Sequence, residues 1–280
     1  MNVRLTTLCD NLVGSIGFIG EWGFSILVEC GEEKILLDTG MTGSVVYNAV
    51  NNGIDLNQIT RIVISHGHLD HTGGLRNLLQ VMRKNVEIII HPEAWAKKYA
   101  TRPETTGSQV HFIGIPFVKA ELENLGASFT LSREPVWIND HIVTTGEVPM
   151  KTSFESIDNN LFVKTEEKLK QDKVLDDQAL IINTLKGLIV VLGCGHHGMI
   201  NTLMHAQEIT GVKKILAVLG GTHLFRSDSY QINQSIAKLQ EFKVEKIGVS
   251  HCTGMPAAMA LMNHFGNRFF FNHVGKVTEF

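Results

Sequence analysis

Three imidazoles and one carboxylate are crowded into one short run of the chain. They belong to His66, His68, Asp70 and His71. A fold gains little from packing these groups together, whereas a divalent metal ion needs their lone pairs to converge. The preceding residues 61–65 are mostly β-branched and apolar, and a glycine pair follows at 73–74. The pattern therefore predicts a metal site where a buried strand ends in a turn.

Two other strand-like segments also end in glycine-rich turns that contain histidine, at 193–198 and 251–254. If these turns meet the first one at a common edge, the six donors divide into two sets. The first donor set is His66, His68 and His196, and the second donor set is Asp70, His71 and His251. Neighbouring side chains in a turn diverge, so we expect only one of His196 and His197 to be a ligand, and we favour His196.

Two further polar residues follow apolar strands. His223 comes after Gly220-Gly221-Thr222, and three roles are open to it: metal ligand, donor to a substrate oxyanion, or polar residue at the pocket rim. Asp38 ends the strand-like segment 34–38. We expect its carboxylate to accept a proton from a ligand histidine and so to set the tautomer of that ring. The alternative is an Asp that caps the turn beside Gly40.

The elements that must position these groups alternate between strand and helix periodicity, which predicts a layered α/β fold. Strands are expected at 3–8, 24–29, 34–38, 61–65, 86–90, 128–131, 136–138, 142–145, 160–165, 179–184, 187–192, 214–219, 245–250 and 268–271. Helices are expected at 44–52, 75–82, 92–99, 201–210, 229–242 and 256–265. No internal repeat or linker appears, so we expect one domain over 1–280, with an irregular, substrate-facing segment at about 100–175.

Two local expectations concern charge. The run 166–177 is predicted to be a solvated loop, and the N-terminus of the helix at 201 would suit an anionic group. The remaining histidines are expected to be structural or at the surface. They are His91, His111, His141, His205, His264 and His273.

The composition excludes several classes of protein. The 280 residues are 44% hydrophobic and 19% charged, with a formal net charge of −3 and no basic cluster, which argues against a nucleic-acid partner. The most apolar run, 187–195, has about half the length that a membrane span requires, and no export signal is evident, so we expect a cytoplasmic protein without a membrane partner. Cys194 and Cys252 are expected to be small buried residues, with a ligand or redox role as the alternative.

The chain resembles the metallo-β-lactamase superfamily. Its His-x-His-x-Asp-His signature is matched by residues 66–71, its early Asp-Thr-Gly by Asp38, its isolated third-motif histidine by His196, and its final histidine by His251. Segments 36–40, 176–180, 193–198, 220–224 and 250–254 resemble the branch named after dihydropterin-(ribofuranosyl)aminobenzene 5′-phosphate synthase. The resemblance extends over the whole chain and implies a four-layer αββα sandwich with the metal site at one edge between the sheets.

The chain departs from the family pattern at two places. Family hydrolases usually carry a bridging aspartate before the final histidine, but here the strand ending at Leu219 leads into Gly-Gly-Thr-His, and the nearest carboxylate is Asp228. The second metal ion is therefore expected to bind more weakly or to depend on His223. Met150 stands where the branch leads us to expect an arginine after Gly-Glu-x-Pro, so a phosphate contact is expected to be lost.

The function we expect is metal-dependent hydrolysis of a phosphoester or carboxylic-type ester in a small anionic substrate, with Asp70 and His223 as catalytic residues. One or two divalent ions are expected, zinc first, with manganese and iron as alternatives. The branch resemblance implies a second possibility, a transferase that condenses a pterin pyrophosphate with an aminobenzene riboside phosphate. A non-catalytic metal-binding or sensing protein is the third, and the oligomeric state is open.

Overall fold

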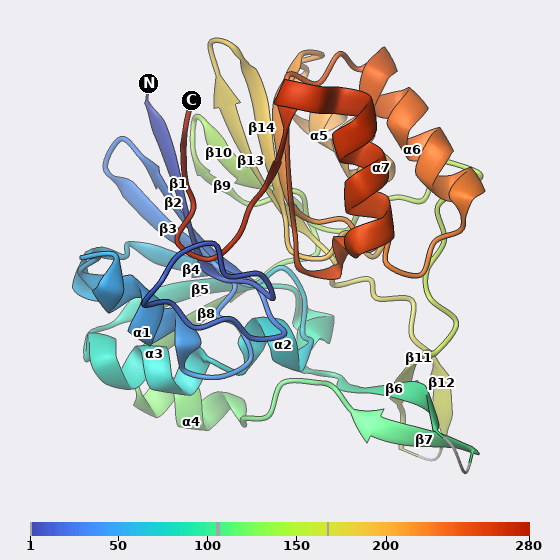
Figure 1. The fold of residues 1–280 in the computed structure, drawn as a ribbon. Helices are drawn as coiled ribbons and strands as arrows, with labels where there is room; N and C mark the ends of the chain where they lie inside the picture. Colours follow the sequence, from blue (N-terminus) through green and yellow to red (C-terminus); the bar gives the residue numbers. More distant parts are fainter. Residues whose placement is uncertain (1, 105–106, 167) are drawn as a thin grey trace.

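Two mixed sheets form the centre of the molecule, as the computed structural model shows for residues 2–104, 107–166 and 168–280 (Figure 1). In this described part of the chain each sheet has seven strands. The first, in the order β18-β1-β2-β3-β4-β5-β8, contains β1 (Val3–Cys9), β2 (Ser25–Cys30), β3 (Glu33–Leu37), β4 (Arg61–Val63), β5 (Val86–Ile90), β8 (Ala127–Leu131) and β18 (Val277–Glu279). The second, in the order β17-β16-β15-β14-β13-β10-β9, contains β9 (Trp137–Asn139), β10 (Ile142–Thr144), β13 (Ala179–Thr184), β14 (Gly187–Leu192), β15 (Ile215–Gly221), β16 (Lys246–Ser250) and β17 (Phe269–Phe271).

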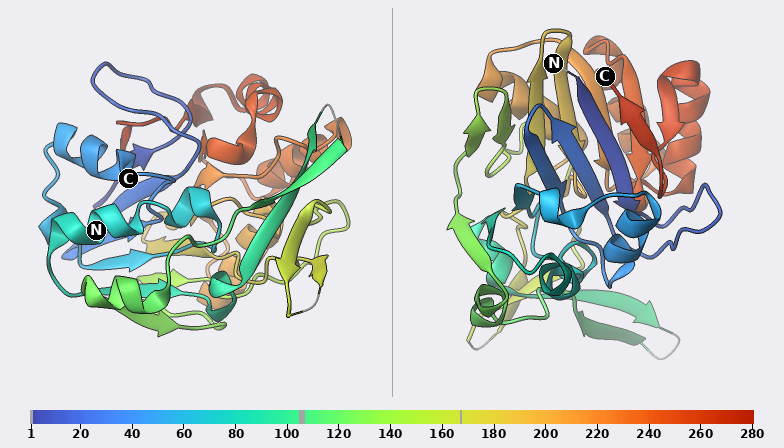
Figure 2. Two further views of the ribbon diagram at one scale, coloured as in Figure 1. Left: turned by 90° about the horizontal axis from the view of Figure 1, so that it is seen from below. Right: turned by 90° about the vertical axis from the view of Figure 1, so that its left-hand side faces the viewer.

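Helices cover the outer face of each sheet (Figures 1 and 2). On the first sheet they are α1 (Ser44–Asn51), α3 (Leu75–Met82) and α4 (Lys119–Asn124), and on the second α5 (Met199–Thr210), α6 (Ser229–Glu241) and α7 (Met255–Phe265). The alternation of side chains along a strand explains the layers: Leu37 packs into the core between the sheets, whereas Leu36 packs under the helices. This is the four-layer αββα sandwich that the resemblance implies.

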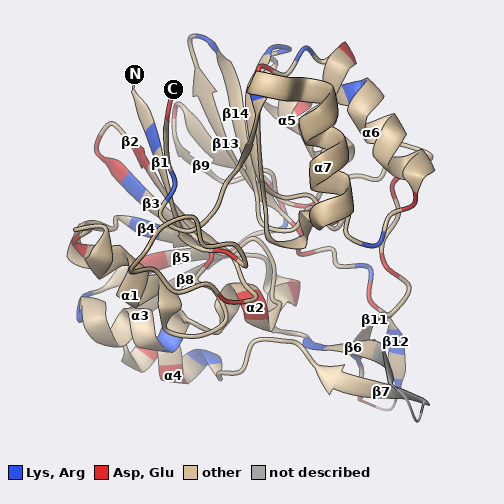
Figure 3. Cartoon of the chain, in the orientation of Figure 1, with Lys and Arg blue, Asp and Glu red and all other residues tan. Residues whose placement is uncertain are grey.

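Short elements complete the chain. They are the helix α2 (Leu69–Thr72) and the 3-10 turns η1 (Leu56–Gln58), η2 (Pro92–Trp95), η3 (His251–Thr253) and η4 (Gly266–Arg268). Lysine, arginine, aspartate and glutamate are interspersed over the elements (Figure 3). Within the described residues, no helix is both long enough and apolar enough to cross a bilayer.

A small third sheet projects beside the sandwich (Figure 1). Its strands follow the order β12-β11-β6-β7, with bounds β6 (Lys97–Glu104), β7 (Gly107–Phe112), β11 (Leu161–Lys164) and β12 (Leu169–Gln171). The helix expected at 92–99 is therefore wrong beyond Trp95, because residues from Lys97 onward pair with β11 as an antiparallel strand. Tertiary strand pairing outweighs the local signal of Pro92.

The expected solvated loop at 166–177 is also wrong in its second half. β12 is exposed, but Asp172, Asp176 and Asp177 are buried. Lys98 donates to Asp172 (Nζ to Oδ2, 2.9 Å) and to Asp176 (Nζ to Oδ1, 2.8 Å). The charges that suggested solvation neutralise one another inside the fold, because the two aspartates meet a lysine from a distant strand.

Candidate metal centre

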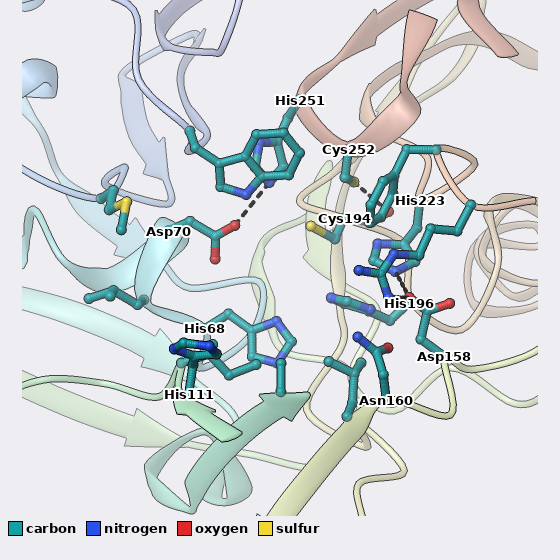
Figure 4. A pocket seen from close by; sticks show the side chains of 18 of the residues that line it. His68, Asp70, His111, Asp158, Asn160, Cys194, His196, His223, His251 and Cys252 are labelled. Atoms are coloured by element: carbon teal, nitrogen blue, oxygen red, sulfur yellow. Dashed lines mark hydrogen bonds and ion pairs between the residues drawn. The ribbon is translucent and has the colours of Figure 1, made fainter. Parts of the chain in front are cut away.

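The turns after β4, β14 and β16 meet at one edge of the two sheets, at the floor of a cavity of about 580 Å³ (Figure 4). The parallel pairings of β3 with β4, of β14 with β15 and of β15 with β16 bring the carboxyl ends of these strands together. The structure thus gathers the histidine-bearing turns that lie far apart in the sequence.

The first donor set is compact and buried. Nε2 of His66 lies 2.9 Å from Nδ1 of His68 and 3.2 Å from Nε2 of His196. Burial, reinforced by neighbouring charges, lowers the pKa of all three rings, that of His68 to about 3. Neutral imidazoles present lone pairs, so the three rings offer the donor chemistry that a divalent ion requires.

The second donor set lies beside the first. Oδ2 of Asp70 is 3.2 Å from Nε2 of His251 and 4.0 Å from Nε2 of His71. The three ligand atoms all lie within 4.8 Å of one another, as do those of the first donor set. The division of the six residues into these two sets therefore agrees with their placement in the structure.

Asp38 holds one imidazole of each donor set. Its Oδ2 accepts hydrogen bonds from the Ser65 hydroxyl at 2.6 Å and from Nδ1 of His71 at 2.7 Å. The hydroxyl of Ser65 has one proton, and it donates that proton to Asp38. Nδ1 of His66, 2.9 Å from Ser65 Oγ, must therefore be the donor to Ser65. His66 and His71 then both direct Nε2 into the site, and a role for Asp38 confined to turn capping does not describe these contacts.

The charges around the second donor set favour a cation. Burial lowers the pKa of His71, but the carboxylates of Asp38 and Asp70 outweigh it and raise the pKa to about 9. Burial likewise raises the pKa of Asp70, yet His71 and His251 outweigh it, and the carboxylate stays ionised. The site therefore attracts positive charge at Nε2 of His71, which is either a proton or a metal ion.

His251 is held by two residues that the sequence analysis did not identify. Its backbone N–H donates to Oδ1 of Asp10 at 2.6 Å, and its ring Nδ1 donates to Oδ1 of Asn11 at 3.0 Å. The ring is thereby turned so that Nε2 faces Asp70. Asp10 and Asn11 directly follow β1, and that position at a strand end is the one signal in the sequence that could have indicated them.

The segment 176–178 fastens the turn that carries the signature. Oδ2 of Asp176 accepts from the backbone N–H of Gly67 at 2.7 Å, and its other oxygen binds Lys98. Gln178 donates its backbone N–H to the Ser65 carbonyl at 2.9 Å. The turn between β4 and α2 is therefore tied to the second half of the chain by charged and backbone hydrogen bonds.

His197 points away from both donor sets. Its ring nitrogens lie 2.5 Å from the carbonyl of Val148 and 2.8 Å from that of Lys173, and its backbone N–H donates to Asp177. Of the two adjacent histidines, His196 is the one that reaches the first donor set, as expected.

His223 lines the cavity but belongs to neither donor set. Its Nε2 donates to Oδ2 of Asp158 at 3.2 Å, and its ring lies against that of His196 with centroids 4.1 Å apart. Burial lowers the pKa of His223, but its interactions with Asp158 and Cys252 outweigh burial and raise the pKa to about 10. His223 therefore presents a cationic ring to the cavity, and Asp158 is a site residue that the sequence did not reveal.

Two other expectations require correction. The N-terminus of α5, expected to suit an anionic group, is occupied by the protein's own carboxylate, because Glu155 accepts from the backbone N–H groups of Ile200 at 2.8 Å and Asn201 at 2.9 Å. His111, expected to be structural or at the surface, forms part of the cavity wall. Its strand, β7, belongs to the third sheet, whose position next to the site depends on tertiary structure.

Both cysteines near the motifs are buried, as expected, but they also line the cavity. The Sγ atom of Cys194 lies 3.2 Å from Nε2 of His71. The thiol of Cys252 donates to the carbonyl of Cys194, at 3.6 Å.

Known proteins resemble this chain in sequence or fold over most or all of its length. Residues 23–199 match the family described as the metallo-beta-lactamase superfamily. A Methanocaldococcus jannaschii protein named 7,8-dihydropterin-6-methyl-4-(beta-D-ribofuranosyl)-aminobenzene-5′-phosphate synthase is 33% identical, with 100% of this chain and 97% of the relative covered. The crystal structure of Tm1679, described as a metal-dependent hydrolase of the beta-lactamase superfamily, is 28% identical with a TM-score of 0.84 and covers 99% of this chain and 98% of its own. The structure of YhfI from Bacillus subtilis, a metallo-beta-lactamase fold protein, is 11% identical to this chain with a TM-score of 0.59. The match covers 100% of this chain and 99% of YhfI, and at this identity it shows the fold alone.

Proposed function

The chain belongs to the metallo-β-lactamase superfamily, and from this premise we propose that it is a metal-dependent hydrolase of a small anionic phosphoester or carboxylic-type ester. The family and the sandwich fold that the sequence resembles are thereby confirmed. The observation that carries the proposal is the pair of adjacent three-residue donor sets at the floor of one open cavity. A structural metal site would be closed, whereas this one faces a space that a substrate can enter.

The donors present fit divalent metal ions. Five imidazoles and one carboxylate suit zinc, with manganese and iron as alternatives. When bound, such ions lower the pKa of a coordinated water and neutralise developing negative charge. The neutral rings of the first donor set and the ionised Asp70 of the second supply the lone pairs for this binding.

The chain's own residues account for the remaining requirements. Asp70 stays ionised and reaches the cavity, so it can accept a hydrogen bond from the attacking nucleophile and orient it. His223, held in its cationic form by Asp158 and Cys252, can donate to an oxyanion through Nδ1. Arg226 is the one lysine or arginine among the described residues that line the cavity, and together with His223 it favours an anionic substrate.

A transferase is the second candidate, and the named relative favours it. That protein is called a synthase of a pterin-containing phosphate, and it matches this chain from end to end at 33% identity. Trp22 and Phe225, at the cavity wall with ring centroids 6.2 Å apart, offer apolar faces on which a flat heterocycle could pack. Metal ions held by the same donor sets would then bind the leaving pyrophosphate.

The test compares both reactions on one preparation of metal-reconstituted protein. Activated phosphomonoesters, phosphodiesters and lactones probe hydrolysis, and pyrophosphate release from a pterin pyrophosphate with an aminobenzene riboside phosphate probes the transferase. We expect ester turnover, and a loss of roughly 10²-fold or more in Asp70→Asn, because the substitution removes both an anionic metal donor and the orientation of the nucleophile. The exposed His264 supplies a control in His264→Ala, which should leave turnover unchanged.

The outcomes separate the candidates. Pyrophosphate release without ester turnover would replace the hydrolase by the transferase. Metal binding without either reaction would favour the non-catalytic protein, and failure to bind one equivalent of any transition metal would contradict all three.

A further inference from the structure

The second donor set lacks the shared carboxylate that would complete it. In the described part of the chain, β15 ends in Gly220-Gly221 and is followed by Thr222, and none of these three residues has a carboxylate. Asp228, the nearest acidic residue along the chain, is used elsewhere, because its Oδ1 caps α6 by accepting from the backbone N–H of Gln231 at 2.8 Å. An anion that both donor sets could share must therefore come from another element.

Cys194 occupies a position between the two donor sets. Its Sγ lies in one group with a ring nitrogen of His66 and a ring nitrogen of His71, all within 4.8 Å of one another, so the sulfur approaches one imidazole from each set. Figure 4 shows the Cys194 side chain at the cavity, between Asp70 and His196. The separation of Sγ from Nε2 of His71, 3.2 Å, is that of a hydrogen bond between the two side chains.

The backbone explains why the thiol stands there. Cys194 directly follows β14, and Gly193 before it packs so closely on Ser65 that a Cβ at 193 would overlap the Ser65 hydroxyl. The end of β14 is thereby held against the signature turn. The thiol of Cys252 donates to the carbonyl of Cys194, and its Sγ groups with Sγ of Cys194 and a ring nitrogen of His223, whereas the group with His66 and His71 contains Cys194.

We propose that the thiolate of Cys194 is the anionic ligand shared by the two donor sets, in the place that an aspartate takes in other members of the superfamily. This inference rests on the metal binding in the proposed function. Without metal, the thiol carries its proton and faces His71; on binding, the sulfur bonds to the metal and the proton passes to solvent. A thiolate ligand selects for soft and borderline ions, so the site should prefer zinc to manganese.

Cobalt(II) substitution tests the proposal without an activity assay. Apoprotein titrated anaerobically with Co(II) should take up two equivalents and develop a thiolate-to-cobalt charge-transfer band in the near ultraviolet. Cys194→Ser should abolish the band and lower the affinity for the second equivalent of cobalt by about 10-fold or more. This is the scale of loss expected for groups that support a metal site. Cys194→Asp should lack the band but retain two equivalents, because an anionic donor is restored.

The matched control is Cys252→Ser, another buried cysteine of the same cavity, which should keep the band. A band that survives Cys194→Ser, or two equivalents bound by wild-type protein without a band, would overturn the role of Cys194 and leave the metal-dependent function standing. A wild-type protein that takes up no cobalt would instead contradict the proposed function itself. Circular dichroism of each variant identifies loss of fold.

Discussion

At the scale of single residues, Asp38 is the side chain on which both donor sets depend. Its carboxylate sets the tautomer of His71 directly and that of His66 through Ser65. Asp38 is fully buried and adopts a left-handed backbone conformation, with φ of +59°. Such a conformation costs a non-glycine residue of order 1 to 3 kcal/mol, and it is retained where the surrounding contacts require it.

Asp38→Asn should weaken metal binding to both donor sets roughly 10- to 100-fold, because an amide replaces the anion that accepts from His71 and Ser65. Competition with a chelator of known affinity measures the change. Asp55→Asn is the control, since Asp55 caps an exposed turn through the backbone N–H of Asn57. Equal metal affinity in Asp38→Asn and wild-type protein would show that Asp38 only shapes the turn.

At the scale of elements, the segment from 172 to 178 connects three parts of the fold. Asp172 and Asp176 meet Lys98 of β6, and Asp176 also binds the backbone of the signature turn. Burial raises the pKa of Asp176, but Lys98 outweighs burial and holds the pKa below its ordinary value of 3.8. Both charges are buried, so each depends on the other for compensation.

Lys98→Met should lower the free energy of unfolding by about 3 to 5 kcal/mol, because two buried carboxylates lose their cation. Urea denaturation measures the loss. The same substitution at Lys238, which pairs with Glu241 at an exposed i,i+3 site, should cost less than about 0.5 kcal/mol. Comparable losses in the two variants would contradict the role given to the buried network.

The pH dependence of the same pair has a definite sign. A depressed folded-state pKa means that the contribution of Asp176 is present above its unfolded pKa and is lost as the pH falls through the folded value. Wild-type stability should therefore decline below about pH 4. In Lys98→Met the buried Asp176 carboxylate loses its cation and burial then raises its pKa, so stability should instead decrease as the pH rises from about 4 to about 7. Urea titrations across this range distinguish the two slopes.

At the scale of the whole molecule, the metal centre joins the two halves of the sandwich. Each donor set takes ligands from the turn after β4 of the first sheet and one histidine from the second sheet, His196 or His251. Binding to these sets occurs only when both sheets are in place, so metal binding and folding are coupled.

Metal at 100 times its dissociation constant should raise the free energy of unfolding by about 2.7 kcal/mol for each site, provided that the unfolded chain does not bind. Thermal denaturation of apoprotein and reconstituted protein measures the difference. His196→Ala should remove the contribution of the first donor set, whereas the exposed His264→Ala should retain it. An unchanged melting temperature on metal addition would contradict a centre that spans the sheets.

The sequence by itself predicted the candidate donor residues, whose ligand roles stay predictions, and the layers that carry them. The signature run, the glycine-rich turns and the alternation of apolar residues are local patterns, because ligand spacing and side-chain direction repeat over a few residues. The separation of His196 from His197 also followed from local geometry, and the structure agrees with it.

Only the tertiary structure decided which groups complete the site. Asp10 and Asn11 meet His251 across 240 residues or more of chain, and Lys98 meets Asp176 across 78. The approach of Cys194 to both donor sets likewise depends on how the end of β14 packs against the turn after β4. Contacts of this kind arise from strand order and sheet packing, which place distant segments side by side, and no local spacing encodes them.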